Sequence, residues 1–537
     1  MSAPSPHLQR DFSATLQRAM RAHAQGELAK AERLYTELLA DAPGHFDVLH
    51  GLGQITYQRG RLEAALSLIQ AALKTDLSRV DGFASLGLVF HALAQHERAL
   101  TSYDAGLRIV PRDAELLCRR GVAFLELGRA EEALASFDRA LVAEPEHRDA
   151  LGNRGNALLK LNRVAEALAA YDRALTFAPE NAALLANRAV ALRRLDRPQE
   201  AVISAKQALR SRPGFAQARF VEAVARLTLG DFGAGWRGYE ARALVGDVVR
   251  KDRGFTAPLW LGEPSLEGKT ILLHAEQGFG DTIQFVRYAP LIAARGARIV
   301  LEVQRELTRL LSCLPGIAAV VARNAPLPRF DFHCPLLSLP LACATELATI
   351  PAAIPYIAPA EADIALWRAL LPRRRPRPRI GLAWCGTRSH DNDLNRSMRL
   401  ETLAPLLDLA HATFVSLQHE VREEDAAFLE SRGEIVRIAP EFSDFADTAA
   451  VIASLDAIIS VDTAVAHLAG AMGKPLFLLL PFAADFRWLR ERRDSPWYPS
   501  ARLYRQPVFG DWASAVDALR GDLALLGDLA QDGLHAG

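Results

Sequence analysis

The first segment that could do chemistry is the run QGFGDT at 277–282. It follows a β-rich apolar segment and opens a stretch with the apolar spacing of a helix. Gly278 and Gly280 would let a ligand approach the backbone, and a helix N-terminus offers unpaired N–H groups. The spacing is not G-x-G-x-x-G, so no dinucleotide site is predicted. Asp281 has two interpretations, a helix cap or a catalytic carboxylate, and capping is the commoner use of Asp at such a position.

The second segment is DTAVAH at 462–467, between the apolar runs 457–461 and 476–480. Thr463 would begin a helix at the carboxyl end of a strand, which is where open α/β sheets bind ligands. The free N–H groups and the helix dipole at this end favour an anion, and a diphosphate fits best. His467 lies one helical turn further along, on the face of the helix that begins at Thr463.

The third segment is the polar loop GTRSHDNDLNRSMRL at 386–400, after the apolar run 380–384. Arg396 and Ser397 have the chemistry to hold a phosphate. The triplet at 391–393 resembles the D-x-D of metal-dependent sugar transferases, but no second acidic cluster with metal-ligand spacing accompanies it. No metal site is therefore predicted. A phosphate loop is also excluded, because GKT at 268–270 has the wrong glycine spacing and leads into a strand.

These segments need elements that bring them together. After residue 269, short β-rich runs alternate with helical segments, which predicts parallel sheets covered by helices. An Arg- and Pro-rich stretch at 373–379 divides the region, so two lobes are predicted at 269–372 and 379–527. That stretch could bind RNA or phosphate, but the absence of aromatic residues and the zero net charge favour an exposed linker. The predicted strands are 270–274, 299–303, 380–384, 413–417, 435–438, 457–461 and 476–480.

The first half of the chain is an internal repeat with a period of 34 residues. Six units span 12–215 and a weaker seventh continues to 246, with a tail at 1–11 and a linker at 247–268. Within a unit, apolar residues recur at three- and four-residue steps, a turn separates two helices, and Pro commonly ends the second. The most regular series are Ala31, Ala65, Ala99, Ala133, Ala167 and Ala201, and Gly53, Gly87, Gly121 and Gly155.

This period and its small-residue pattern resemble the tetratricopeptide repeat. The resemblance implies an α-solenoid whose concave face binds a peptide or a partner protein. Asn153 and Asn187 share one repeat position, which by resemblance faces this groove. An amide ladder there could pair with a peptide backbone. A merely solvated polar position is an equal alternative, because the preceding unit has Arg119 instead.

The composition excludes several classes of protein. Lys+Arg and Asp+Glu are 63 each, so neither nucleic-acid binding nor polybasic membrane docking is predicted. The 5 cysteines include no C-x-x-C pair, which argues against a disulfide framework or zinc module and favours a reducing compartment. No apolar run approaches the roughly 20 residues of a membrane span, and the N-terminus lacks the pattern of a secretory signal. The expectation is a cytoplasmic protein without an integral membrane segment.

Three features of the second half, Gly280-Asp281, DTAVAH at 462–467 and the tail DFRWLRERRDSPWYPSARLYRQ at 485–506, resemble the family 9 glycosyltransferases. The resemblance implies a GT-B fold, with two facing Rossmann-like lobes that bind the acceptor and the nucleotide-sugar donor. It also implies an inverting transfer with Asp281 as general base, and no metal or cofactor besides the donor. The residues implied to bind the nucleotide sugar are Gly278, Gly280, Arg396, Ser397, Asp462, Thr463, Ala464 and His467.

The chain departs from this family at one position. The donor motif often has Gly after Asp-Thr, where this chain has Ala464, whose methyl group could narrow the approach of a phosphate. Two functions are therefore predicted. One is an active glycosyltransferase whose repeats recruit a protein acceptor, and the other is a repeat scaffold with an inactive nucleotide-sugar-binding domain. Trp488, Trp497 and Tyr498 could stack on a base or sugar, or belong to the core.

Overall fold

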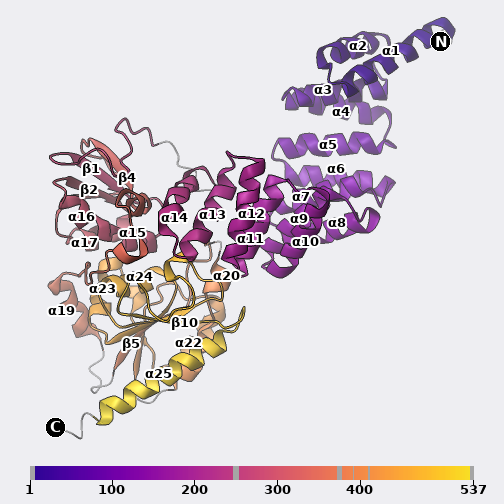
Figure 1. Ribbon diagram of the computed structural model, residues 1–537. Coiled ribbons are helices and arrows are strands. Elements are labelled where there is room, and N and C mark those ends of the chain that lie inside the picture. The colour runs from indigo at the N-terminus through magenta and orange to yellow at the C-terminus, as the bar shows by residue number, and fades with distance from the viewer. Residues whose placement is uncertain (1–5, 246–252, 372–377, 391, 409–411, 533–537) are drawn as a thin grey trace. The chain divides into compact units, whose positions relative to one another are not determined.

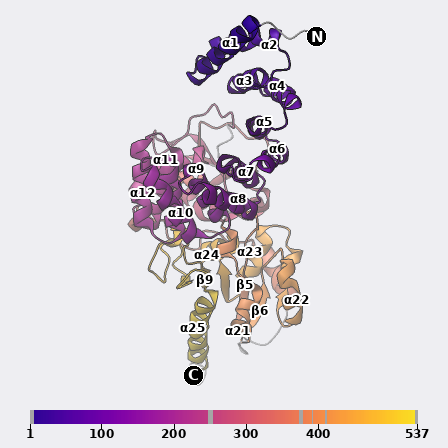
Figure 2. The same ribbon diagram turned by 90° about the vertical axis from the view of Figure 1, so that its right-hand side faces the viewer.

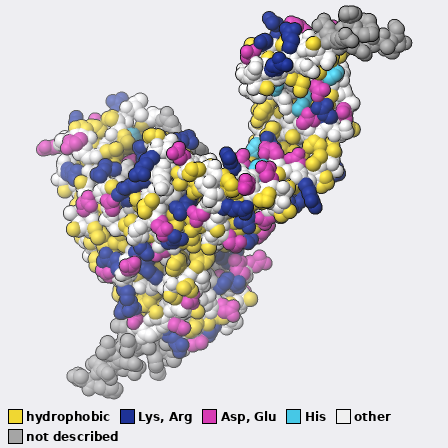
Figure 3. Space-filling view, turned by 45° about the vertical axis from the view of Figure 1, so that its right-hand side comes forward, with side chains coloured by type: hydrophobic (Ala, Val, Ile, Leu, Met, Phe, Trp, Pro, Cys, Tyr) yellow, Lys and Arg dark blue, Asp and Glu magenta, His cyan; other side chains and the backbone are white. Residues whose placement is uncertain are grey.

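The computed structural model describes residues 6–245, 253–371, 378–390, 392–408 and 412–532. It divides into two compact units, residues 1–191 and 192–537. The division lies within helix α11 (Ala182–Arg194), whereas the sequence places the end of the repeats at 246. Within the described ranges, no helix has both the length and the apolar character needed to cross a membrane. On the face shown in Figure 3, basic and acidic side chains are interspersed.

The first unit consists of helices that pack in successive pairs (Figures 1 and 2). Gly26, Gly60 and Gly128 adopt positive φ values of 77°, 73° and 73° in the turns between paired helices, where glycine costs least. The first helix begins at Pro6, so part of the predicted tail is helical. The helices are α1 (Pro6–Ala24), α2 (Leu28–Asp41), α3 (Phe46–Gln58), α4 (Leu62–Thr75), α5 (Val80–Ala92), α6 (His96–Ile109), α7 (Ala114–Glu126), α8 (Ala130–Ala143), α9 (Arg148–Lys160), α10 (Val164–Phe177) and the start of α11.

In two of the helix pairs, α7 with α8 and α9 with α10, a glycine of one helix packs against an aromatic ring of the other. A Cβ on Gly121 of α7 would lie 2.5 Å from the ring of Phe137 of α8. The same is true of Gly155 in α9 and Tyr171 in α10. Both rings are fully buried, so the periodic glycines provide the space that the large side chains of the paired helices fill.

The second unit contains two parallel sheets. The first lobe has the strand order β3-β2-β1-β4, with every pair of neighbours parallel. Its strands are β1 (Thr270–His274), β2 (Arg298–Val303), β3 (Ile317–Ala322) and β4 (Phe332–Pro335). Its helices are α15 (Phe279–Phe285), α16 (Ala289–Ala293), α17 (Thr308–Leu311) and α18 (Leu339–Ala342). The next helix, α19 (Glu361–Leu370), packs against the second lobe, where Trp367 Nε1 donates to Asp447 Oδ1 at 3.0 Å.

The second lobe has the strand order β10-β9-β8-β5-β6-β7, again parallel throughout. The first strand of this lobe, β5, is central. The next two strands add on one side of it and the last three on the other, so this is a doubly wound, Rossmann-like sheet. Its strands are β5 (Arg379–Ala383), β6 (Thr413–Ser416), β7 (Val436–Arg437), β8 (Ala457–Val461), β9 (Leu476–Leu480) and β10 (Ala501–Arg505). The helices are α20 (Asp393–Arg396), α21 (Ala404–Leu407), α22 (Glu423–Ser431), α23 (Phe445–Ala453), α24 (Ala464–Ala471) and α25 (Trp512–Asp532).

Three strands were not predicted, and each has a weak local strand pattern. β3 is rich in Ala, β4 contains His and Pro, and β10 is ARLYR. Pairing with neighbouring strands overrides these weak local preferences. The predicted strand 435–438 shortens to the two residues of β7. The predicted linker at 373–379 lies largely outside the described residues, since only 378 and 379 are included.

The last repeat helices belong to the second unit, and the last two of them contribute to its core. These are α12 (Pro198–Ser211), α13 (Ala216–Thr228) and α14 (Phe232–Tyr239). Trp236 of α14 is buried, with its ring centroid 6.2 Å from that of Phe285 in the first lobe and 5.7 Å from that of Phe486 in the second. Figure 1 shows α13 and α14 beside the two lobes. The seventh repeat therefore packs with both lobes rather than ending in a free linker.

The described part of the predicted linker, residues 253–268, also packs on the first lobe. Trp260 is buried, its backbone N–H donates to His333 O at 2.8 Å, and its ring N–H donates to Pro264 O at 2.9 Å. This segment forms neither a helix nor a strand. Because it bonds to the backbone of the edge strand β4, this segment lies along the edge of the sheet instead of separating two domains.

Candidate active site

The candidate site is a cavity of about 1190 Å³ in the second unit. It lies where strand order reverses, between β5 and β8, and loops that follow β1, β5, β8 and β9 line it. At such a switch point the connecting loops diverge to opposite faces of the sheet and leave a crevice for a ligand. The three segments singled out by sequence therefore line one cavity.

The loop at 276–282 is held by residues of two neighbouring segments. Gln304 donates from Nε2 to Gln277 O at 2.8 Å and accepts from Thr282 Oγ1 at 2.9 Å. Arg242, which follows α14 and is buried, donates from Nη2 to Glu276 Oε1 at 2.6 Å. The glycine turn is thus anchored both to the first lobe and to the end of the repeats.

Gly280 and His467 form the contact between the two predicted motifs. A Cβ on Gly280 would lie 2.7 Å from His467 Cδ2, so only glycine allows α15 to approach α24 this closely. His467 is buried, and its Nδ1 lies 2.9 Å from Tyr498 Oη. Its ring is stacked on Trp488 at a centroid distance of 5.4 Å. His467 therefore joins the two lobes and sets the position of the helix that carries it.

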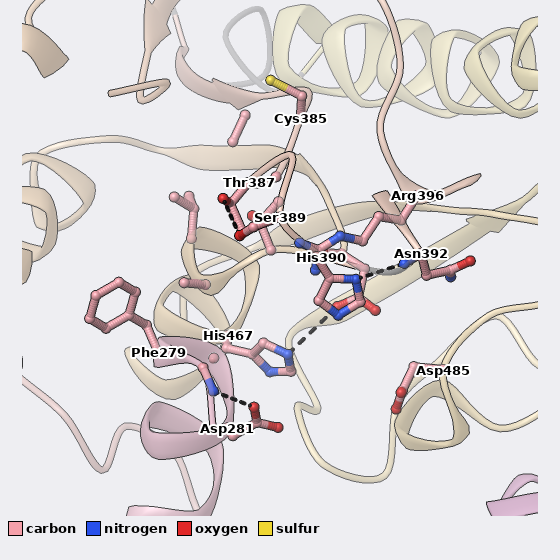
Figure 4. Close-up of a pocket in the computed structure, with 18 of the residues that line it drawn as sticks. Phe279, Asp281, Cys385, Thr387, Ser389, His390, Asn392, Arg396, His467 and Asp485 are labelled. Atoms are coloured by element: carbon pink, nitrogen blue, oxygen red, sulfur yellow. Dashed lines mark hydrogen bonds and ion pairs between the residues drawn. The ribbon is translucent and has the colours of Figure 1, made fainter. Parts of the chain in front are cut away.

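Asp281 caps its own helix and also faces the cavity. Its Oδ2 accepts from Gly278 N at 3.0 Å, and its Oδ1 accepts from Arg487. Arg487 bonds Asp485 as well, at 2.8 Å. Burial alone would lower the pKa of Arg487, but the carboxylates of Asp485 and Asp281 raise it. Figure 4 shows Asp281, His467 and Asp485 around the same space.

The N-terminus of α24 opens into the cavity beside Asp462. Thr463 does not cap the helix with its side chain, since its hydroxyl lies 3.1 Å from Ser460 Oγ. Across the described chain, the backbone N–H groups of residues 464–466 have no hydrogen-bond acceptor. Thr463 and Ala464 line the cavity. Three amide donors at the positive end of a helix dipole are therefore free to bind an anion.

Asp462 is the charged residue at this helix start. Burial alone would raise its pKa, but the attraction of His467 and the charge of Arg396 lower the pKa to about 2. Its Oδ1 lies 3.6 Å from His467 Nε2. Arg396 donates from Nη1 to the backbone oxygen of Asp462 at 3.2 Å.

Arg396 lies against the glycine that follows β5. A Cβ on Gly386 would lie 2.5 Å from Arg396 Nη2, so the guanidinium is seated on bare backbone. Its Nε is buried without a hydrogen-bond partner among the residues described. Arg396 lines the cavity and connects the loop after β5 to the end of β8. It is thus a cation with donor capacity left for a ligand.

Ser397 lies beneath this loop and is not one of the residues that line the cavity. It is buried, accepts from Gly386 N at 3.0 Å and donates to Asp393 Oδ1 at 2.6 Å. Asp393 also pairs with Arg422 at 2.5 Å. The structure therefore gives Ser397 and Asp393 a supporting role in the loop, whereas the sequence had placed Ser397 against phosphate.

Asp391, the first residue of the triplet at 391–393, lies outside the described residues. Among those described, no group of three or more His, Cys, Asp or Glu is arranged to hold a metal ion.

His390 lines the cavity and was missed by sequence reasoning, although it stands inside the polar loop. Its Nδ1 accepts from Asn392 N at 3.1 Å, which leaves Nε2 to carry the proton and donate into the cavity. Burial in the cavity and the positive charge of Arg396 lower the pKa of His390. Asp485 and Arg487 also line the cavity. They stand at the start of the tail at 485–506 that carries the family resemblance, but neither was predicted to be a site residue.

The aromatic residues near the C-terminus belong to the core. Trp488, Trp497 and Tyr498 are fully buried and do not line the cavity. They support His467 and Arg287 instead, since Arg287 Nη1 donates to Trp497 O at 2.7 Å and its guanidinium lies 4.8 Å from the Tyr498 ring. Stacking on a ligand is therefore not their role. All 5 cysteines are free thiols.

Asn153 and Asn187 of the repeats are connected through Asn156. Asn187 Nδ2 donates to Asn156 Oδ1 at 2.9 Å, and Asn156 Nδ2 lies 3.3 Å from Asn153 Oδ1. Tyr171 Oη donates to Asn156 Oδ1 at 2.7 Å. Asn156 was not singled out from the sequence, because its repeat position carries no other Asn. The amides thus form one polar network across neighbouring helix pairs.

Different family models match the helical first half and the α/β second half of the chain. Models of the tetratricopeptide repeat match residues 22–82, 84–144 and 118–182. The model of glycosyltransferase family 9 (heptosyltransferase) matches residues 412–480, which include α24 and its N-terminus. Asp281 lies outside this match.

Among curated proteins, the chain is 29% identical over 324 residues to Protein FlbA of Caulobacter vibrioides. The match covers 55% of this chain and 53% of FlbA, so the chain spans about half the length of this relative. Solved structures match the repeats. A tetratricopeptide repeat protein from Parabacteroides merdae is 17% identical, covers 44% of this chain and 94% of its own, and has a TM-score of 0.37. TTC0263 from Thermus thermophilus is 26% identical, with 34% and 98% covered and a TM-score of 0.30.

Proposed function

Because the chain joins tetratricopeptide repeats to a glycosyltransferase family 9 domain, we propose that it transfers a sugar from a nucleotide-sugar donor to an acceptor hydroxyl. The observation that carries this proposal is the cavity shared by the N-terminus of α24 and the turn at 278–281. Its volume is above the range of about 300–1,000 Å³ usual for small-molecule sites. It therefore has room for a donor and for the reacting part of an acceptor.

The donor diphosphate would bind at the second lobe. The free amides of 464–466 and the helix dipole attract it, Arg396 supplies a full charge, and His390 supplies a further donor at Nε2. These groups are in place before the reaction, so they stabilise the charge that develops on the leaving diphosphate. Such preorganised stabilisation contributes on the order of 3 kcal/mol. We therefore propose a transfer that needs no metal ion.

Asp281 is the proposed general base. Its carboxylate would accept the proton of the acceptor hydroxyl while that oxygen attacks the anomeric carbon. The bond from the anomeric carbon to the diphosphate oxygen breaks, its electron pair leaves with the nucleoside diphosphate, and the anomeric configuration inverts. Arg487 has to release one oxygen of Asp281 for this step, and Asp485 remains as its second partner.

Asp485 is a second candidate for the base. It lies on the same arginine, lines the cavity, and its side chain is 35% exposed. Its Oδ1 accepts from Arg487, which leaves the other oxygen for an acceptor. The same ion pairs favour an alternative function, a scaffold that binds nucleotide sugars without turnover, because Arg487 bonds one carboxylate oxygen of each candidate base.

Paired substitutions distinguish these possibilities. UDP-, ADP- and GDP-sugars are incubated with the wild type, Asp281→Asn and Asp485→Asn, with and without candidate acceptors, and the released nucleoside diphosphate is measured. We expect Asp281→Asn to lower release by about 100-fold or more while nucleotide affinity stays within about twofold, and Asp485→Asn to have a small effect. The reverse pattern would make Asp485 the base. Nucleotide-sugar binding without turnover by the wild type would favour the scaffold.

The repeats would recruit the acceptor. Tetratricopeptide arrays hold peptides or partner proteins on their concave face, and the amide network of Asn153, Asn156 and Asn187 offers donors and acceptors to a peptide backbone. We therefore propose a protein acceptor. Removal of the network by Asn156→Ala should weaken transfer to that protein without changing release from the donor in its absence.

A further inference from the structure

The end of a repeat helix forms part of the cavity wall. Arg193 and Arg194 are the last two residues of α11, and both line the cavity beside Asp485 and Arg487. They belong to the second compact unit, which begins at residue 192. Glycosyltransferase lobes alone would not supply these side chains, so the site of this protein has a contribution from the repeats.

The other charged residues of the cavity are mostly compensated. Arg487 pairs with Asp281 and Asp485, and Asp444 pairs with Arg309 at 2.7 Å. Arg193 differs from them. Among the described residues, none forms a hydrogen bond or an ion pair within 4.0 Å with its guanidinium. Its side chain is half-buried, so the cation is partly removed from water without an opposite charge in contact.

The electrostatic surroundings of Arg193 are unfavourable for its positive charge. Burial in the cavity wall and the neighbouring charge of Arg194 lower the pKa of Arg193, while Asp485 opposes this only from a distance. An anion bound at Arg193 would relieve both unfavourable effects. Asp485 also interacts with Arg487, so Arg193 stands on the side of the cavity that carries the two candidate bases.

An ion pair fixes this end of α11 on the second lobe. Asp196, in the turn after α11, accepts from Arg490 Nε at 3.0 Å. Arg490 stands between Leu489 and Glu491, which adopt left-handed φ values of 53° and 52°. Both partners are only 25% exposed. The turn that follows Arg193 and Arg194 is therefore tied to the segment that carries Asp485 and Arg487.

We infer that Arg193 binds an anionic group, a phosphate or a carboxylate, of the substrate held in this cavity. The repeats then complete the substrate site as well as recruiting a partner. The inference rests on the proposed function for the nature of the ligand. The anionic group could belong to the nucleotide donor or to an acidic sugar on the acceptor side, and guanidinium recognises both through the same paired N–H donors.

The test compares Arg193→Ala with Arg188→Ala. Arg188 lies on the same helix but pairs with Asp172 at 2.5 Å and is not part of the cavity. The probes are UDP, ADP and GDP for the donor, and glucuronate against glucose for the acceptor side, titrated by calorimetry and by NMR. We expect Arg193→Ala to weaken binding of the nucleotides or of glucuronate by about tenfold or more, while Arg188→Ala stays within about twofold.

Two further variants separate charge from geometry. Arg193→Lys keeps the charge but loses the paired donors, so it should restore part of the affinity and its dependence on salt. Asp196→Asn keeps Arg193 but weakens the ion pair that holds the turn after α11, so a smaller loss of affinity is expected.

Each outcome has one meaning. Loss confined to the nucleotides assigns Arg193 to the donor, and loss confined to glucuronate assigns it to the acceptor. Equal affinity of Arg193→Ala and wild type for every probe that the wild type binds would overturn the inference and leave the proposed function standing. A wild type that binds no nucleotide but loses glucuronate in Arg193→Ala would contradict the proposed function alone. A wild type that binds none of the probes would contradict both.

Discussion

Gly121 in the repeats and Gly280 in the cavity both make room for a ring, but with different results. The ring against Gly121 is Phe137, which comes from the next helix, is apolar and only fills space. The ring against Gly280 is His467, which comes from the other lobe, contacts Tyr498 and lies near Asp462. The same packing of a glycine against a ring therefore stabilises the repeats at Gly121, whereas at Gly280 it positions polar groups of the site.

Two more glycines extend this comparison to the site. Gly386 lies beneath the guanidinium of Arg396, and a Cβ on Gly470 would lie 2.5 Å from Tyr498. In the repeats the glycines recur with the period, whereas in the site each one occurs once. Substitutions in the repeats should accordingly change the free energy of unfolding, and those in the site should change ligand affinity.

The largest expected effect is on the stability of the repeats. Phe137→Ala removes a fully buried ring and leaves a cavity, so it should lower the free energy of unfolding by about 3–5 kcal/mol. Urea unfolding followed by circular dichroism measures this, with Phe137→Leu as a milder control. Nucleotide affinity, measured by calorimetry below the unfolding range, should stay within about twofold of wild type. A large loss of affinity would break the separation between the two regions.

Gly280→Ala should act on the site. The added Cβ meets His467, and overpacking of this kind costs about 1–3 kcal/mol. Because α24 has to move, we expect nucleotide affinity to fall by about tenfold. Addition of His467→Ala to Gly280→Ala should restore part of the loss in a double-mutant cycle. Gly121→Ala is the matched variant in the repeats, and it should lower stability without lowering affinity.

Lowering the pH should remove the contribution of the Asp462 carboxylate to the free energy of unfolding. The pKa of Asp462, about 2, lies below the value of about 3.9 for an unfolded chain, so its carboxylate stabilises the fold above about pH 4. This contribution is lost as the pH falls towards 2, and it is on the order of 2 kcal/mol. The difference in unfolding free energy between wild type and Asp462→Asn should therefore shrink across that window.

The control for acid is Glu166→Gln in the repeats. Glu166 is solvent-exposed and pairs with Arg163 at 2.7 Å, so water screens the pair and its pH-dependent difference should be far smaller. A constant difference for Asp462→Asn between pH 5 and pH 2 would contradict the role given to its charge.

Thr463→Glu tests the helix end directly. A negative charge at the start of α24 opposes bound diphosphate, and charge at a helix terminus is worth up to about 2 kcal/mol. We expect nucleotide affinity to fall by about tenfold or more, with Thr463→Ser close to wild type. Unchanged affinity in Thr463→Glu would mean that the phosphates bind elsewhere in the cavity.

The smallest effect is expected from Ala464→Gly. Removal of the methyl group widens the approach to the amides, so affinity should rise by a few-fold at most, against the flexibility that glycine adds. Calorimetry with the same nucleotides measures this change. A rise of about 100-fold would mean that Ala464 keeps the wild-type site closed to donors, which favours the scaffold alternative.

Much of the fold could be predicted from local patterns. β1, β8 and β9 have the predicted bounds, because each is a short, mostly apolar run between turn signals. β10 was missed because Arg502 and Arg505 interrupt its apolar residues. The inclusion of α13 and α14 in the core of the second unit was missed for a different reason. Their sequence follows the repeat, and only the aromatic residues around Trp236 change its packing partners.

The candidate site divides in the same way. The sequence placed Gly280, Asp281, Arg396 and Thr463 at the carboxyl ends of strands, and all four line the cavity. It had no means to identify Arg487 as the partner of Asp281, or to show that Ser397 lies beneath the loop. Those contacts join segments that are far apart in the chain.

By itself, the sequence determined the repeat, the change to strand–helix alternation and the polar residues at strand ends, because all of these are local and periodic. Only the tertiary structure decided which glycine lies against which ring, that Asp281 shares an arginine with Asp485, and that Arg193 of a repeat helix reaches the cavity. The physical reason is that a contact made once, between distant segments, depends on how packed elements meet, and it leaves no period for a sequence to show.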